Sequence, residues 1–208
     1  MSFRLEEKIK LHISDLNKIK VYLTSLSAKE LFPQREISSV YFDNKKLEMY
    51  LDSEEGSTPR KKIRVRQYPN DKDNKKKLET KITSVEGKFK VSKDVSNELS
   101  SFYFKRGFFD HQYGMCYPII KISYTREYWI LNNSRLTIDY NINYKSISEG
   151  KNFDDRQTLI LELKASNNIV SNLNLLNEII PLNKQRFSKY CEGINSLFNL
   201  PFNQRLIV

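Results

Sequence analysis

The segment K-K-I-R-V-R-Q-Y alternates cationic and β-branched side chains. Ile63 and Val65 favour a strand with one buried face, and successive side chains of a strand point to opposite faces. Lys62, Arg64 and Arg66 therefore share the other face. Arginine binds phosphate oxygens through paired N–H groups, and lysine binds them as a point charge. The segment consequently predicts a surface that binds anionic groups, phosphate in particular.

Six other segments repeat this alternation, with long charged side chains of both signs on one face. A half-exposed sheet with cross-strand ion pairs would account for any one of them. The repeated choice of arginine and glutamate, with few small polar residues, instead favours a face that lines a closed interior. The aligned residues are Arg4, Glu6 and Lys8; Glu79 and Lys81; Lys88 and Lys90; Tyr124 and Arg126; Arg135, Thr137 and Asp139; and Glu162 and Lys164.

Such a closed interior would have a defined chemistry. An antiparallel barrel of about eight strands has room for side chains or one narrow ligand. Buried cations need counter-charges, and Glu6, Glu79, Asp139 and Glu162 supply some of them. The carboxylates can also hold a hard divalent cation such as Mg²⁺ or Mn²⁺. The pattern therefore predicts a site for a linear phosphate chain and a metal ion.

The composition agrees with an anionic partner. The 208 residues include 35 Lys and Arg against 25 Asp and Glu, a formal net charge of +10, which favours nucleic acid, phosphate-rich small molecules or acidic membranes as partners. Only Cys116 and Cys191 are present, without a zinc-binding cluster, which is typical of a reducing cytosol.

Several classes of protein are excluded by missing motifs. No apolar stretch reaches the roughly 20 residues of a membrane helix, and the first residues lack a signal-peptide core. We therefore expect a soluble, cytoplasmic protein. The sequence has no G-x-x-x-x-G-K-[ST] loop, which excludes an ordinary P-loop enzyme.

Strands joined by short turns dominate the predicted elements. Their order predicts one α+β domain over residues 1–208, a closed antiparallel β-barrel of about eight strands with flanking helices. Hairpin turns are predicted at 85–87 and 132–134, and Ser14 is a candidate N-cap. The predicted strands are 3–9, 37–42, 61–68, 78–83, 88–91, 119–130, 135–142 and 158–163, the predicted helical segments are 14–25, 44–50, 169–179 and 187–197, and the predicted loops are 52–59 and 69–77.

Eight segments, in order, resemble the polyphosphate-polymerase domain of the vacuolar transporter chaperone (VTC) family and its bacterial relatives, within the CYTH-like superfamily of triphosphate tunnel metalloenzymes. Each segment is short, so the specificity comes from their number and order along nearly the whole chain. The opening R-x-E-x-K is similar to the polymerase branch, whereas E-x-E-x-K opens the cyclase and thiamine triphosphatase branch. The segments are R-L-E-E-K (4–8), V-Y-F-D-N (40–44), K-I-R-V-R-Q-Y (62–68), L-E-T-K (78–81), I-S-Y-T-R-E-Y (122–128), R-L-T-I-D (135–139), L-E-L-K (161–164) and F-S-K-Y-C-E-G (187–193).

The resemblance implies a role for each matched residue. Glu162 would be the principal ligand of a Mn²⁺ or Mg²⁺ ion, assisted by Glu6 or Glu79. The implied catalytic residues, which grip phosphates, are Arg64, Arg66, Lys81, Arg126, Arg135 and Lys164. The expected substrate-binding residues are Arg4, Lys8, Lys90, Tyr124 and Lys189, with Lys88 and Lys93 as alternatives to Lys90.

These features together predict phosphoryl transfer, which depends on positioning and charge neutralisation more than on a protein nucleophile. We expect synthesis of polyphosphate from a nucleoside triphosphate. A triphosphatase with water as acceptor and a non-catalytic polyphosphate binder are alternatives. A nucleic-acid-binding module is another, but carboxylates within the basic face would repel a nucleic-acid backbone, so no nucleic-acid partner is expected.

Other noticeable residues have simpler interpretations. His12 and His111 stand alone in polar surroundings and are expected at the surface. Trp129 lies on the phase opposite to Arg126, so we expect it to pack against a helix. Asp43 could be a ligand, but an N-cap for the following helical turn is the favoured interpretation.

Overall fold

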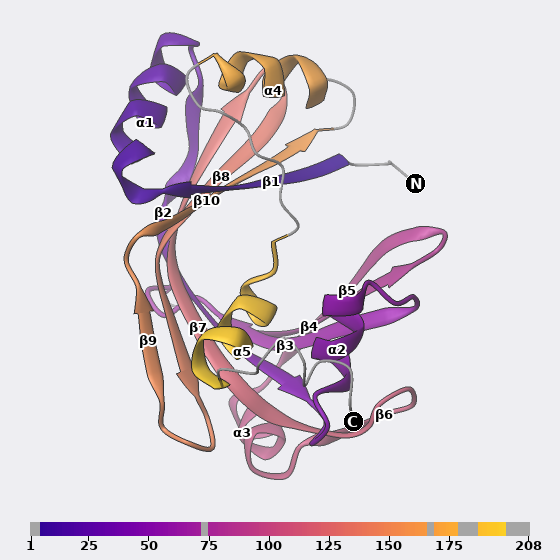
Figure 1. Ribbon diagram of the computed structural model, residues 1–208. Helices are drawn as coiled ribbons and strands as arrows, with labels where there is room; N and C mark the ends of the chain where they lie inside the picture. Colours follow the sequence, from indigo (N-terminus) through magenta and orange to yellow (C-terminus); the bar gives the residue numbers. More distant parts are fainter. Residues whose placement is uncertain (1–4, 72–74, 166–168, 179–186, 199–208) are drawn as a thin grey trace. The chain divides into compact units, whose positions relative to one another are not determined.

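The computed structural model describes residues 5–71, 75–165, 169–178 and 187–198 (Figure 1). These residues form one long sheet of antiparallel strand pairs with a few helices, which confirms the α+β class. The strands are β1 (Leu5–His12), β2 (Lys29–Asp43), β3 (Arg60–Gln67), β4 (Lys76–Ser84), β5 (Gly87–Val95), β6 (Phe108–Asp110), β7 (Gly114–Leu131), β8 (Ser134–Ser146), β9 (Asn152–Asp155) and β10 (Thr158–Ala165).

The predicted closure of the barrel is wrong. The strand order is β1-β10-β8-β7-β2-β3-β4-β5, with β6 on β7 and β9 on β8. Within the residues that the structure describes, no pairing joins the two end strands β1 and β5, so the sheet is open. Alternation decides which side chains share a face, but closure also requires matched tilt and stagger of all strands, which alternation does not encode.

The described chain forms two compact units. Unit 1 comprises residues 1–36, 124–142 and 154–187, and unit 2 comprises residues 37–123, 143–153 and 188–208. Strands β2, β7 and β8 each contribute to both units, so this division does not decide the single-domain prediction.

In unit 1, one face of strands β1, β10 and β8 is apolar. Ile9, Leu161 and Ile138 lie opposite one another across these strands and are fully buried. Helices α1 (Leu16–Ser25) and α4 (Ile169–Asn177) supply further side chains to the same core, among them Ile19 and Leu176. Trp129 belongs to this core as well, which confirms its predicted packing against a helix. The charged residues of the three strands consequently share the opposite face.

In unit 2, too, the apolar face of the strands packs against helices. Ile63 and Val65 of β3 are buried in a core with Phe42 and Met49. Helix α2 (Glu48–Glu55) supplies Met49, and helix α3 (Asn97–Arg106) packs Phe104 against the same core. Helix α5 (Lys189–Phe198) buries an apolar side of its own. The predicted alternation of β3 is thereby confirmed.

Several predicted boundaries differ from the structure. Ser14 does not cap α1, because it lies in the 3₁₀ turn Ile13–Asp15, where His12 Nδ1 accepts its N–H at 3.3 Å. Helix α2 begins later and extends further than predicted, into the predicted loop 52–59. Helix α3 was not predicted, although Ser96 caps it through Leu99 N (3.1 Å). The predicted hairpin turn at 85–87 is confirmed by the Ser84↔Gly87 pair of β4 and β5.

Candidate functional site

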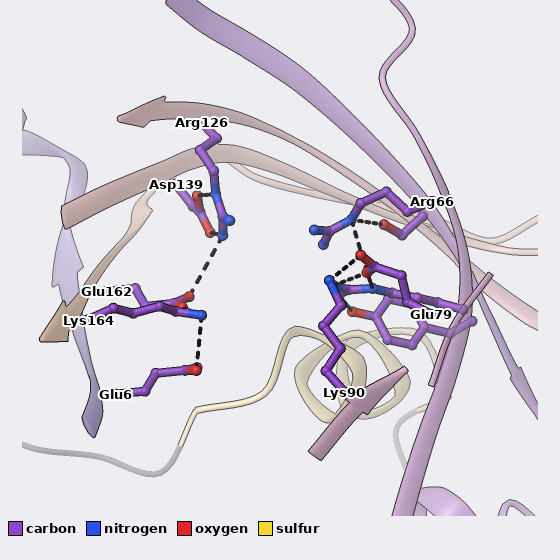
Figure 2. A network of polar contacts seen from close by, with 11 residues as sticks. Glu6, Arg66, Glu79, Lys90, Arg126, Asp139, Glu162 and Lys164 are labelled. Carbon is purple, nitrogen blue, oxygen red and sulfur yellow. Dashed lines mark hydrogen bonds and ion pairs between the residues drawn. The ribbon is translucent and has the colours of Figure 1, made fainter. Parts of the chain in front are cut away.

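The first group of candidate residues lies on β2, β3, β4 and β5 of unit 2, and is called the Arg64 cluster: Tyr41, Arg64, Arg66, Glu79 and Lys90. The strand register places Arg64 between Tyr41 and Glu79 on one face. Glu79 Oε2 accepts Arg64 Nε at 2.8 Å and lies 2.6 Å from Arg64 Nη2. It lies 3.8 Å from Arg66 Nε, and its other oxygen pairs with Lys90 (Figure 2). Three cations thus converge on one buried carboxylate.

The electrostatics of this cluster follow from the converging cations. Burial alone raises the pKa of Glu79, but Arg64, Arg66 and Lys90 outweigh it and hold the pKa at about 2. Tyr41 accepts a hydrogen bond of 2.6 Å from Arg64 Nη1. Burial raises the pKa of Tyr41 as well, but Arg64, Arg66 and Lys189 bring it below its ordinary value. The cluster therefore stabilises negative charge.

A row of lysines continues the Arg64 cluster from Lys90 across β4 to β3. Lys62, Lys81 and Lys90 are directly opposite one another on β3, β4 and β5. Lys62 Nζ donates to Ser188 Oγ at 2.9 Å, just before Lys189 begins α5. Like charges on neighbouring strands destabilise a sheet, so this row favours an anion on the same face.

The second group lies on β1, β7, β8 and β10 of unit 1, and is called the Glu162 cluster: Glu6, Arg126, Asp139, Glu162 and Lys164. Asp139 accepts both Arg126 Nε (2.5 Å) and Arg126 Nη2 (2.7 Å). Lys164 Nζ joins two carboxylates, lying 2.7 Å from Glu162 and 3.0 Å from Glu6 (Figure 2). Arg126 also lies 3.8 Å from Glu162. Here cations and carboxylates alternate in a continuous chain.

Glu162 and Arg126 are both charged in the Glu162 cluster, because each is held by partners of opposite charge. Burial raises the pKa of Glu162, but Lys8, Arg126 and Lys164 outweigh it and hold the pKa well below its usual range. Burial lowers the pKa of Arg126, but Asp139 above all raises it well above its ordinary value. Both groups therefore remain charged at neutral pH.

The remaining predicted residues lie around these clusters. Lys8 pairs with Glu6 at 3.2 Å, and the Tyr124 ring lies beside Arg126, with Cζ 5.4 Å from the ring centroid. Arg135 is opposite Lys164 and exposed. Arg4 lies outside the described residues. Of the three candidate lysines on β5, Lys90 and Lys88 share the charged face, whereas Lys93 is opposite Leu78 on the other face.

Some residues of the clusters escaped prediction as site residues. Tyr41 and Ser39 occupy the same face of β2, and Ser39 Oγ accepts Arg66 Nε at 3.3 Å. Their alternation with Val40 and Phe42 was the available signal. The N-cap of α2 is Leu47, so the prediction of Asp43 as the N-cap is wrong in position. The Asp43 carboxylate nevertheless accepts the backbone N–H groups of Met49 (3.0 Å) and Tyr50 (2.9 Å) in the first turn of α2. His12 and His111 are exposed, as predicted.

The carboxylates of unit 1 fit a divalent cation better than Glu79 does. No group of three or more His, Cys, Asp or Glu residues with metal-binding geometry occurs in the described part of the chain. Glu6 and Glu162 nevertheless converge on one ammonium, and Thr137 Oγ1, opposite Glu162, is buried without a hydrogen-bond partner. Two carboxylates with substrate phosphates are a common ligand set for Mg²⁺. Glu79 is already surrounded by three cations, which disfavours a further one.

Solved structures with the same fold are known. A candidate adenylate cyclase from Bacillus halodurans aligns with a TM-score of 0.63 at 10% identity, covering 100% of this chain and 98% of that one. A candidate adenylate cyclase from Vibrio parahaemolyticus aligns with a TM-score of 0.55 at 11% identity, covering 93% of this chain and 98% of that one. At such low identity, the likeness shows the fold alone.

Comparison with curated proteins finds no match. None of the described helices has both the length and the apolar character needed to span a bilayer. The model of the VTC domain matches residues 3–106 and 107–198, nearly the whole chain. The predicted membership is thereby confirmed, and the chain belongs to the VTC domain family.

Proposed function

We propose that this protein transfers the terminal phosphoryl group of a nucleoside triphosphate to the end of a phosphate chain, with a divalent metal ion. The observation that carries the proposal is the excess of cations in the Arg64 cluster, where Arg64, Arg66 and Lys90 surround the carboxylate of Glu79. Buried positive charge in excess is costly unless an anion joins it. A chain of phosphates supplies that anion in a linear form that suits a strand surface.

The reaction requires no protein nucleophile. A terminal oxygen of the acceptor chain forms a bond to the γ-phosphorus, and the bond from that phosphorus to the β,γ-bridging oxygen breaks, so that a nucleoside diphosphate leaves. Negative charge grows on the bridging oxygen during this step. Arg64 and Arg66 are already held by Tyr41 and Ser39, so they can donate to phosphate oxygens with little reorganisation.

The Glu162 cluster, taken by itself, also has residues that would bind phosphate groups. Arg126 is held by Asp139 and keeps its charge, and Arg135 is exposed with no ion-pair partner among the described residues. Glu162 and Glu6 would hold the Mn²⁺ or Mg²⁺ ion, because both are directed toward one cation already. When bound, the ion neutralises charge on phosphate oxygens.

Incubation with ATP and MnCl₂, followed by gel electrophoresis, tests the proposal. We expect a ladder of long polyphosphate and a matching release of ADP, both abolished by a chelator. Release of free phosphate without long chains would instead indicate a triphosphatase of the same site. If wild-type protein forms neither product, the proposed catalysis is wrong and a binding role remains.

A further inference from the structure

A continuous chain of buried side-chain contacts links helix α5 to the Arg64 cluster within unit 2. The Tyr190 hydroxyl of α5 donates to Asp43 Oδ2 at 2.6 Å. The Tyr190 ring stacks on the Tyr41 ring, with centroids 5.2 Å apart and an interplanar angle of 10°. The Tyr41 hydroxyl accepts the 2.6 Å hydrogen bond from Arg64 Nη1. Arg64 is thus connected to Asp43 through two aromatic side chains.

Asp43 holds the far end of this chain in one orientation. Its Oδ1 accepts the backbone N–H groups of Asn44 (2.8 Å) and Met49 (3.0 Å), and its Oδ2 accepts that of Tyr50 (2.9 Å) besides the Tyr190 hydroxyl. The carboxylate is fully buried, so a rotation would leave several N–H groups without a partner. The position of the Tyr190 hydroxyl is fixed as a result.

Helix α5 is itself held in place by close packing and a hydrogen bond. A Cβ at Gly193 would meet side-chain atoms of Ile120 and Tyr144 at 2.5 Å, so α5 packs closely against these two side chains. The Tyr50 hydroxyl also donates to Asn195 Oδ1 at 2.5 Å. These contacts restrain α5 and the ring of Tyr190, and the stacked ring limits where Tyr41 can lie.

We propose that Tyr190 and Asp43 are positioning residues of the phosphate site: they fix Tyr41, and through it the direction of the Arg64 guanidinium. This inference rests on the proposed function only in so far as Arg64 binds phosphate. Since linkage is reciprocal, phosphate bound at Arg64 stabilises the docked position of Tyr190 in turn. Neither residue would contact the phosphate itself.

The protonation states agree with these roles. Burial raises the pKa of Tyr190 well above its ordinary value, so its hydroxyl keeps the proton that it donates. Burial also raises the pKa of Asp43 to about 6, against hydrogen bonds that lower it. At pH 8 the protonated Tyr190 hydroxyl therefore donates to an ionised Asp43 carboxylate. Measurements at that pH test the hydrogen bond that the structure shows.

The test compares Tyr190→Phe with Tyr50→Phe at pH 8. Both variants remove a hydroxyl that helps to hold α5, and the ring that stacks on Tyr41 is that of Tyr190, so Tyr50→Phe is the matched control. Nuclear magnetic resonance of the Arg64 Nε–H group reports the order of the guanidinium without any ligand. We expect Tyr190→Phe to increase the motion of this group and Tyr50→Phe to leave it unchanged. Equal behaviour of the two variants would overturn the inference.

Titration with tripolyphosphate then measures the consequence for binding. Tyr190→Phe should weaken binding about five- to tenfold, the scale of one buried hydrogen bond, whereas Tyr50→Phe should change it less than about twofold. The double variant Tyr41→Phe/Tyr190→Phe should bind no worse than Tyr41→Phe alone, because Tyr190 acts through Tyr41. Additive losses would contradict this order of action.

The outcomes separate the two proposals. If wild-type protein does not bind tripolyphosphate, the proposed function fails, while a change in the Arg64 signal in Tyr190→Phe still supports the positioning role. If binding is tight but Tyr190→Phe changes neither Arg64 nor the affinity, the positioning role fails alone. Should Tyr190→Phe not fold, Tyr41→Phe, which keeps every hydrogen bond of α5, must show the same release of Arg64 or the inference is wrong.

Discussion

The two charged clusters have opposite electrostatic designs. In the Arg64 cluster, three cations share the carboxylate of Glu79, so positive charge remains in excess. In the Glu162 cluster, Glu6, Asp139 and Glu162 balance Arg126, Lys164 and the neighbouring Lys8. An anion can join the first cluster directly. It can join the second favourably only with an added cation, which is a physical reason to expect metal dependence there and not at Glu79.

The largest expected effect comes from Glu162→Gln, which keeps the shape but removes a charge that a hard cation needs. Turnover at limiting Mn²⁺ should fall by about 100-fold or more, the scale of a lost electrostatic contact in a transition state. The fold should survive, because Arg126 keeps Asp139 and Lys164 keeps Glu6. Glu149→Gln, an exposed carboxylate paired with Lys151, is the control. Unchanged activity would show that the metal is held elsewhere.

Arg64→Ala and Arg66→Ala examine the cluster with excess positive charge. Each should weaken tripolyphosphate binding by about 1.5–3 kcal/mol, the scale of charge-assisted hydrogen bonds. Isothermal titration measures the loss directly. Arg156→Ala, at an arginine whose side chain is 82% exposed, should have no effect. Losses in that variant equal to those at Arg64 would mean that the net charge of the protein, and not the cluster, attracts the ligand.

Glu79→Gln should strengthen the binding of tripolyphosphate, whereas Glu162→Gln should lower metal-dependent turnover. Removing the counter-charge of the Arg64 cluster increases its excess of cations, so tripolyphosphate should bind several-fold more tightly, within about tenfold. The Mn²⁺ requirement of turnover should remain as in the wild type. A higher Mn²⁺ concentration for half-maximal turnover, which the sequence-based assignment of Glu79 as an assisting ligand implies, would contradict the contrast between the clusters.

Acid stability provides an independent measure of Glu79. Burial raises the pKa of Glu79, but Arg64 and Arg66 outweigh burial and hold the pKa at about 2, below the ordinary value of 4.5. A lowered pKa contributes stability that is present above the ordinary value and is lost as the pH falls toward 2. Denaturant unfolding between pH 5 and 2 should therefore show a shallower decline for Glu79→Gln than for the wild type. An identical decline for the two proteins would mean that the neighbouring cations do not lower the pKa of Glu79 in the folded protein.

The smallest expected effect on tripolyphosphate affinity comes from Lys90 of β5, and Lys93 of the same strand is its control. Lys90 pairs with Glu79 but is 46% exposed, so Lys90→Gln should weaken tripolyphosphate binding only about two- to threefold. Lys93 lies on the other face, opposite Leu78. Lys93→Gln should leave the affinity unchanged. A larger effect at Lys93 would show that the ligand binds the other face of the β4–β5 hairpin.

The sequence was sufficient for features that depend on alternation alone. It predicted that Arg64 and Glu79 each belong to a charged strand face, and the register then placed them side by side. It was insufficient wherever distant segments meet. The contact of Tyr190 with Asp43 joins residues 147 positions apart, and no local pattern encodes it. Closure failed as a prediction for the same reason, since it depends on the relation between β1 and β5 rather than on either strand.

Thermal unfolding with competing anions tests most directly whether the Arg64 cluster and the Glu162 cluster bind a phosphate chain. Tripolyphosphate at about 100 times its Kd should raise Tm by roughly 5–10 °C, through linkage to the folded state, and Mn²⁺ should increase the shift because the balanced Glu162 cluster needs a cation. An oligonucleotide of equal total charge should protect far less, since the sugar and base at each of its phosphates hinder access to the buried Arg66 and Glu162, whereas an unsubstituted phosphate chain has no such groups. If the oligonucleotide protects as well as tripolyphosphate, these clusters are not phosphate-chain sites and the protein is a nucleic-acid-binding module.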